Sequence, residues 1–107
     1  MPSLAYSQLT ELGEMFRMLG DPTRLAIVLS CMDEPVSVSD IAASLEISQS
    51  LASHHLRLLR ATRLVRNTRR GRSTLYQIND EHVRTMLANM VEHTQEDLSE
   101  QEGINHD

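Results

Sequence analysis

Apolar residues at helical spacing predict two helices in the first third of the chain. In the first helix they recur every three or four positions, at Leu9, Leu12, Met15, Phe16 and Leu19. Gly20 ends this helix, and Asp21 followed by Pro22 is typical of the start of another, with aspartate as the N-cap. We therefore expect a second helix over residues 23–32, whose nearly continuous apolar face makes Cys31 a buried residue.

A pair of helices joined by a short turn is predicted next. Ser37, with Asp40 three residues later, resembles a capping box and begins a short helix. After a tight connection, Ser48 caps a longer helix over residues 49–62. The leucines of this helix that we expect to face inward are Leu51, Leu58 and Leu59. Two helices joined in this way are typical of a helix-turn-helix.

From residue 64 the helical spacing gives way to the pattern of β-strands. Two β-prone runs flank Gly71, which supplies the turn, and they predict a hairpin over residues 64–78. Asn79 or Asp80 then caps a final helix. Its apolar stripe consists of Val83, Met86, Leu87, Met90 and Val91.

Together these elements predict one mainly α-helical domain with a β-hairpin wing, a winged helix-turn-helix. We expect it to span residues 1–98 and to be followed by a disordered polar tail over residues 99–107. The first residues lack the basic and apolar regions of a secretory signal, and no stretch approaches the roughly 20 apolar residues of a membrane span. One cysteine forms no internal disulfide, so we expect a cytoplasmic protein.

Positive charge is concentrated in one part of the chain. The formal net charge is −5, yet residues 47–79 contain seven arginines and no acidic residue. This stretch carries +7, which leaves −12 on the rest of the chain. Such asymmetry indicates a basic face on an acidic body, and a solvated arginine-rich helix is an equally compatible alternative.

The start of the second helix of the pair carries small polar residues that suit the DNA major groove. Short side chains let a helix enter the groove closely, and serine and glutamine form hydrogen bonds with base edges or phosphates. We expect DNA contacts from Ser48, Gln49, Ser50, Ser53 and His54. Arginines at the end of this helix and on the hairpin neutralise phosphates, namely Arg57, Arg69, Arg70 and Arg72. His55 is spaced to lean toward the core, and we expect a structural role for it.

The final helix has two histidines with carboxylates nearby. His82 and His93 lie 11 residues apart, within about 20° of one another around the helix but about 16 Å apart along it. His93 and Glu96 are neighbours on one face, whereas Asp80 converges on His82 only from a cap position. An antiparallel pair of such helices would join the two ends in two symmetric sites. Spacing alone favours the simpler interpretation of a helix cap and solvated side chains.

Three segments resemble the ArsR/SmtB family of metal-responsive repressors. In chain order they are LGDPTRLAIVLSCM, SVSDIAASLEISQSLASHHLRLLRATRLV and RRGRSTLYQI. The resemblance implies a homodimeric winged-helix protein that binds operator DNA and releases it when an effector binds. By position, the residues that match the DNA-reading residues of the family are Gln49, Ser50, Ser53 and His54. Leu51 stands where relatives often have a polar residue.

The resemblance also implies a metal site on the last helix. The zinc-sensing branch of the family carries an Asp-x-His and a His-x-x-(His/Glu) motif there, matched here by Asp80, His82, His93 and Glu96. Two imidazoles and two carboxylates suit four-coordinate Zn²⁺ and accommodate Co²⁺ or Ni²⁺. The Cys-x-Cys motif of the other metal site of the family is replaced by Ser37 and Ser39. We therefore expect no thiolate site for arsenic, cadmium or lead.

Three functions are compatible with these observations. The leading one is a zinc-responsive repressor that acts as a homodimer on double-stranded operator DNA. The second is a DNA-binding repressor that answers another signal or none, with the last helix serving only for dimerisation. The third is a small zinc hydrolase, but catalytic zinc keeps a position open for water, and four protein ligands leave none. We therefore expect a regulator and not an enzyme, with neither a membrane nor another protein as partner.

Overall fold

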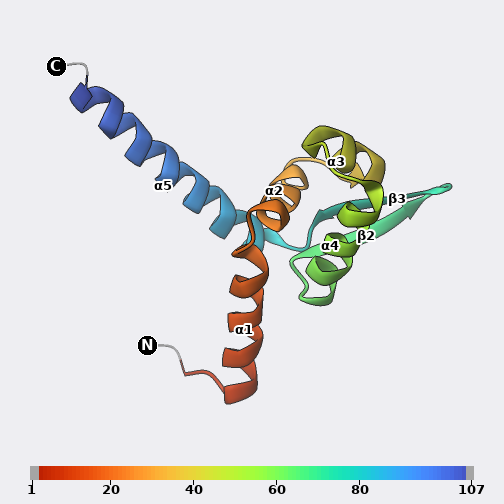
Figure 1. Ribbon diagram of the computed structural model, residues 1–107. Coiled ribbons are helices and arrows are strands. Elements are labelled where there is room, and N and C mark those ends of the chain that lie inside the picture. The colour runs from red at the N-terminus through yellow and green to blue at the C-terminus, as the bar shows by residue number, and fades with distance from the viewer. Residues whose placement is uncertain (1–2, 106–107) are drawn as a thin grey trace.

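The computed structural model describes the backbone of residues 3–105 and the side chains of residues 3–96. Helices α2, α3 and α4 form the body, a β-hairpin extends from one side of it, and α1 and α5 project from the other side in different directions (Figure 1). The elements in chain order are α1 (Tyr6–Leu19), α2 (Pro22–Ser30), β1 (Val36–Ser37), α3 (Val38–Leu45), α4 (Gln49–Ala61), β2 (Val65–Arg70), β3 (Ser73–Ile78) and α5 (Glu81–Asn105). This order confirms the predicted winged helix-turn-helix.

Four helices begin at the cap residues that the sequence predicts. In each case a side-chain oxygen accepts a hydrogen bond from the backbone N–H three residues later, at 2.9–3.2 Å. The four caps are Asp21 for α2, Ser37 for α3, Ser48 for α4 and Asp80 for α5. These short polar side chains therefore fix where the chain turns from loop to helix.

The hairpin belongs to a three-stranded antiparallel sheet in the order β1-β3-β2. Strands β2 and β3 pair from Val65 opposite Ile78 to the tip, where Gly71 adopts the left-handed conformation with φ 58°. The short strand β1 was not predicted, because two residues are too few to show alternation. It pairs Val36 with Tyr76 and so attaches the base of the wing to the start of α3.

The core lies between the body helices and the base of the wing. Its most deeply buried large side chains are Ile27, Val28, Cys31, Ile41, Leu56, Leu59, Leu64, Val65 and Ile78. Backbone hydrogen bonds from Ile78 N to Cys31 O and from Asn79 N to Leu64 O join the end of β3 to this core. Burial raises the pKa of the Cys31 thiol to about 12, so it is a small apolar core residue, as predicted.

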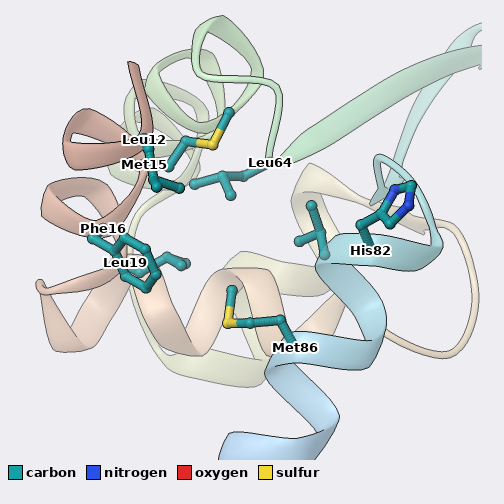
Figure 2. Close-up of a pocket in the computed structure, with 8 residues that line it drawn as sticks. Leu12, Met15, Phe16, Leu19, Leu64, His82 and Met86 are labelled. Atoms are coloured by element: carbon teal, nitrogen blue, oxygen red, sulfur yellow. The ribbon is translucent and has the colours of Figure 1, made fainter. Parts of the chain in front are cut away.

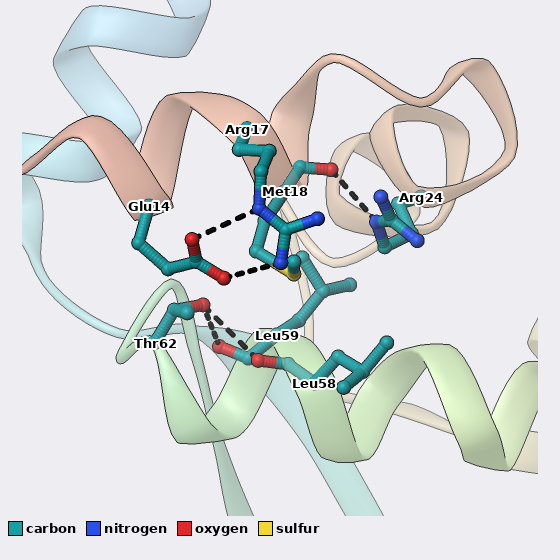
Figure 3. Close-up of polar contacts among 7 residues, drawn as sticks. All are labelled: Glu14, Arg17, Met18, Arg24, Leu58, Leu59 and Thr62. Carbon is teal, nitrogen blue, oxygen red and sulfur yellow. Dashed lines mark hydrogen bonds and ion pairs between the residues drawn. The ribbon is translucent and has the colours of Figure 1, made fainter. Parts of the chain in front are cut away.

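Hydrogen bonds also fix the corner between α1 and α2 and the end of α4 (Figure 3). Arg24 Nε donates to the carbonyl oxygen of Met18 at 2.9 Å, which fastens the start of α2 to the last turn of α1. Thr62 Oγ1 donates to the carbonyl oxygens of Leu58 and Leu59 at 3.1 Å. The last carbonyl groups of a helix have no donor within the helix, so this side chain supplies one at the end of α4.

The prediction that Leu51 faces inward is wrong, because its relative exposure is 41%. Leu58 is half-buried and Leu59 is fully buried, as expected. Leu51 lies in the first turn of α4, about 100° around the helix from the buried stripe of Ala52, Leu56 and Leu59. The neighbouring helices therefore cover that stripe and leave Leu51 in contact with solvent.

The end of the chain also differs from expectation. We expected a tail over residues 99–107, but α5 continues through Asn105. Glutamate and glutamine are good helix formers, and no proline interrupts this stretch. Residues 106 and 107 lie outside the described residues, and the domain extent of residues 1–98 stays a prediction.

The two projecting helices leave part of their predicted apolar stripes exposed. In α1, Leu9 and Phe16 are 56% exposed and Leu12 is 41% exposed. In α5, Leu87 is buried whereas Met90 is 56% exposed. A single chain thus leaves much of the apolar face of α1 exposed, together with Met90 of α5.

The two leucines of α4 provide a test of this packing. Because Leu56 is fully buried, Leu56→Ala is expected to lower the free energy of unfolding by about 2–5 kcal/mol. Leu51→Ala is expected to change it by about 0.5 kcal/mol or less. Urea unfolding at one fixed protein concentration measures both, and similar losses for the two variants would contradict the orientation of α4.

Candidate nucleic-acid interface and metal centre

One face of α4 is polar and directed to solvent. Ala52, Leu56 and Leu59 are fully buried on the opposite face. The polar face consists of Ser50, Ser53, His54 and Arg57, which share one side of the helix at 100° per residue; all are exposed except Ser53, which is half-buried. The helix thus offers side chains of the kind that read base edges, on a rigid scaffold.

The start of α4 borders a small polar hollow that sequence reasoning missed. The hollow, of about 270 Å³, lies between the starts of α3, α4 and β3. Its polar side chains come from Ser37, Ser39, Gln49, Ser73 and Thr74. The signal for it is the density of hydroxyl residues in the segments SVS and RST, which meet only when β1 pairs with β3. Ser48, beside it, uses its hydroxyl as the cap of α4.

The arginines divide into two groups by their partners. Within the described part of the chain, five have a hydrogen bond or ion pair inside the molecule: Arg17 with Glu14, Arg24 with Met18, Arg63 with Glu11, Arg66 with the Gln77 side-chain amide, and Arg84 with Glu81. Among the described residues, no such bond is made by Arg57, Arg60 or the arginines at the hairpin tip, Arg69, Arg70 and Arg72. These exposed cations are the ones available to phosphates.

The end of α4 is held to α1. Arg63 takes the left-handed conformation with φ 60°, and Leu64 N donates to Leu59 O at 3.0 Å, which closes the helix as a Schellman motif. The Arg63 guanidinium forms an ion pair with Glu11 of α1. A projecting helix is therefore connected directly to the end of the helix that carries the DNA-reading face.

His55 lies on the flank of α4 toward the start of α2. It is half-buried, and its Nδ1 is buried without a hydrogen-bond partner. Desolvation lowers the pKa of His55, and the nearby charge of Arg24 lowers it further, whereas Asp21 acts in the opposite sense. His55 is therefore a packed, neutral histidine, which agrees with the structural role expected for it.

The start of α5 brings two of the four proposed metal ligands together. Asp80 Oδ1 lies 3.8 Å from His82 Nδ1, and the His82 side chain is 99% exposed. The Asp80 carboxylate also accepts the Val83 N–H, and this bond holds the pKa of Asp80 below its ordinary value. The cap position therefore orients an ionised carboxylate beside an accessible imidazole, and a carboxylate retains further lone pairs for a metal.

The other two proposed ligands lie farther along the same helix. His93 and Glu96 are exposed and one turn apart, about 16 Å from the first pair along the helix axis. Among the described residues, no three His, Cys, Asp or Glu side chains are close enough to share an ion. The structure thus holds the four proposed ligands as two separate pairs, which we call half-sites, and does not bring the pairs together within one chain.

An apolar pocket lies next to the first half-site (Figure 2). It has a volume of about 190 Å³ and lies between α1, the turn after α4 and the start of α5. It is lined by Leu12, Met15, Phe16, Leu19, Leu64, His82, Val83 and Met86, and we call it the junction pocket. His82 therefore borders both the half-site and a pocket that contains Leu64, the residue after the last turn of α4.

Comparison with known proteins identifies a set of relatives. The signature of the bacterial regulatory proteins of the arsR family matches residues 21–67. The chain is 36% identical over 93 residues to a Synechocystis protein described as a transcriptional repressor SmtB homolog. The aligned region covers 87% of this chain and 70% of that protein. It is 35% identical over 95 residues to a Staphylococcus aureus CadC homolog, a cadmium resistance regulatory protein, which covers 87% and 78%.

The fold is also found among solved structures. The homodimeric winged helix-turn-helix DNA-binding domain of Mb0332 from Mycobacterium bovis superposes with a TM-score of 0.82, covering 94% of this chain and 95% of that one. The two sequences are 23% identical, so this likeness concerns the fold. In the part of the chain that the structure describes, no helix is both long and apolar enough to cross a membrane.

The environment of His55 predicts how stability depends on pH. Its pKa in the folded state lies below the ordinary value of about 6.5, so the unfolded chain binds a proton first as the pH falls. The contribution of His55 to the free energy of unfolding is therefore expected to be present in full above pH 7 and to be lost as the pH falls through 6.5. His55→Gln should reduce this dependence in urea titrations between pH 5 and 8. Equal slopes for wild type and His55→Gln would contradict this assignment.

Proposed function

The chain belongs to the ArsR family of bacterial regulatory proteins, and we propose that it is a zinc-responsive repressor that binds operator DNA as a homodimer and releases it when zinc binds. The relatives are transcriptional regulators, which confirms that the chain is a regulator rather than an enzyme. We place it in the cytoplasm, where a bacterial regulator meets DNA. The observation that carries the zinc proposal is the Asp80–His82 pair, set at the start of a helix whose other end carries His93 and Glu96.

The DNA-binding part of the proposal rests on the polar face of α4 and the unpaired arginines. The proposed base-edge contacts are Gln49, Ser50, Ser53 and His54, with Ser48 at the helix start beside the phosphates. The proposed backbone contacts are Arg57, Arg69, Arg70 and Arg72. The polar hollow beside Gln49 extends the same surface toward the wing.

The dimer is supported by what a single chain leaves uncovered. Leu9, Leu12 and Phe16 of α1 and Met90 of α5 are exposed, and one recognition helix reads few base pairs. Mb0332, which shares this fold, is homodimeric. An antiparallel pairing of two α5 helices would cover apolar surface and bring each Asp80–His82 pair to a His93–Glu96 pair.

The four side chains fit zinc by the chemistry of their donors. Zn²⁺ binds imidazole nitrogen and carboxylate oxygen in four-coordinate sites, and each half-site supplies one of each. One relative is named for cadmium resistance, but the described residues contain one cysteine, and it is buried in the core. Hard and borderline ions such as Zn²⁺, Co²⁺ and Ni²⁺ suit this set better than soft ones.

The junction pocket provides a path from the metal to the DNA-reading helix. His82 and Leu64 line the same pocket, and Leu64 directly follows the closing turn of α4. Drawing the start of α5 toward a second chain would therefore shift the support of α4 and change the spacing of the two recognition helices. DNA requires one spacing between half-sites, so a different spacing in the metal-bound dimer would weaken operator binding, and linkage makes the effect reciprocal.

We predict that the hairpin arginines act on phosphates without reading sequence. Changing Arg69, Arg70 or Arg72 to alanine is expected to weaken binding to selected and random duplexes alike and to reduce the salt slope of log K by about one. Gln49→Ala should instead change the preference among duplexes and leave the slope intact. Fluorescence anisotropy over a range of salt concentrations measures both, and a changed preference for the arginine variants would reverse the assignment.

We predict that zinc weakens operator binding through all four proposed ligands. For wild type the expected loss is about 5- to 150-fold in affinity for a duplex selected by the protein itself. His82→Ala and His93→Ala should keep the metal-free affinity and lose the response. Asp80→Asn is the sharpest variant, because asparagine caps helices as well as aspartate does but lacks the charge that a zinc ligand supplies.

The control for these variants is Glu92→Gln, at an exposed carboxylate of the same helix that lies one turn before Glu96 and is not among the four proposed ligands. It should respond to zinc like wild type. Wild type that keeps its operator affinity at saturating zinc, while binding zinc at one ion per chain, would favour the second function, a repressor that answers another signal.

A further inference from the structure

The junction pocket is an apolar surface that the single chain leaves open. Seven of its eight lining residues are apolar, and they come from α1, the turn after α4 and the start of α5. Figure 2 shows the labelled apolar side chains around a common space, with Met86 at one edge, whereas the His82 imidazole points away from that space. A pocket of about 190 Å³ bordered by one polar side chain excludes a charged or strongly polar occupant.

The geometry points to an occupant from the same protein: we propose that Met90 of a second copy fills the junction pocket, reciprocally in the two halves of the dimer. The inference rests on the proposed function, because the pairing of the four ligands sets the register of the two α5 helices. It goes beyond that function by assigning the pocket, its occupant and a contribution to dimer stability that needs no metal.

The register follows from the ligand positions. If Asp80 and His82 of one chain meet Glu96 and His93 of the other, the two-fold axis passes beside residues 87 and 88. Met86 of one copy then lies opposite Met90 of the other. Both methionines lie on the helix face that His82 and His93 share, about 40° and 80° around the helix from His82.

The direction in which Met90 points also agrees with its placement in the junction pocket of the other copy. A two-fold axis perpendicular to an antiparallel helix pair leaves equivalent side chains leaning to the same side in both copies. Met90 leans to the side on which Val83 and Met86 line the pocket with α1. Met90 of the second copy therefore approaches the pocket from its open side.

The chemistry of the side chain agrees as well. Met90 is 56% exposed, and it is the one large apolar side chain of α5 that is exposed within residues 81–96. An unbranched thioether adapts to irregular apolar spaces such as one lined by two methionines, a phenylalanine and several aliphatic residues. His82 and Leu64 both line this pocket, so the dimer contact and the proposed metal-to-DNA path involve the same residues.

A pair of variants, each with one cysteine added to the buried Cys31, tests the contact directly. Affinity-tagged Met86→Cys and untagged Met90→Cys are mixed without metal, allowed to exchange, and oxidised; the expected product is a mixed disulfide-linked dimer. Each variant alone should cross-link far less, because two copies of position 86, or of position 90, lie about 6 Å apart along the axis in addition to the gap across it. Wild type is the control, since Cys31 is buried in the core.

Sedimentation equilibrium in EDTA provides the second measurement. Met90→Ala is expected to raise the dimer dissociation constant about tenfold or more, because two methionines lose their burial per dimer. Leu51→Ala, at an exposed leucine of α4 away from the pocket, should leave it unchanged. A variant that fails to fold is recognised by circular dichroism, and the cross-linking result then decides.

The outcomes separate this inference from the proposed function. Dimers that bind zinc and release DNA, but give no mixed cross-link and tolerate Met90→Ala, overturn the pocket assignment and leave the zinc-responsive repressor intact. A chain that stays monomeric with and without zinc overturns both. Mixed cross-links together with an unchanged operator affinity in zinc support the pocket assignment and overturn the zinc response.

Discussion

A straight helix holds His82 and His93 about 16 Å apart, and no choice of side-chain rotamer closes that distance. This fixed separation is the constraint on which the proposed function depends. It divides four ligands that suit zinc into two incomplete pairs, so that one chain cannot bind the ion with all four. If the α5 helix of a second chain packs antiparallel, the same separation places the two pairs of each chain opposite those of the other, which gives two equivalent four-ligand sites. In the proposed function, this property of one helix connects metal binding to assembly, and assembly to the spacing of the two recognition helices.

The division of labour along the chain follows from this arrangement. The body and the wing are built around a deeply buried core, and the acid-free stretch of residues 47–79 gives them their positive charge. The projecting helices carry the exposed apolar residues and the proposed ligands. The two parts meet at the Arg63–Glu11 ion pair and at the junction pocket, which both Leu64 and His82 line. These two contacts connect the projecting helices to the end of α4.

Much of this was accessible from sequence, because local chemistry determined it. Cap residues such as Asp21 and Ser48 begin their helices where polar side chains precede apolar periodicity, and Gly71 turns the hairpin. Features that depend on tertiary neighbours were not accessible. Leu51 matches the helical pattern but lies where no other element covers it, and β1 is too short to alternate. The hydroxyl-lined hollow and the junction pocket are each lined by segments that lie far apart in the sequence, so no local pattern predicts them.

The central claim is that each metal site is shared between two chains, and mixed dimers test it most directly. His82→Ala and His93→Ala homodimers each lose both complete sites. A dimer with one chain of each kind retains one intact site, because the unchanged Asp80–His82 pair of one chain faces the unchanged His93–Glu96 pair of the other. Zinc titration of purified mixed dimers should therefore recover one tightly bound ion per dimer, with none in either parent. Mixed dimers that bind no more zinc than their parents would contradict the shared site.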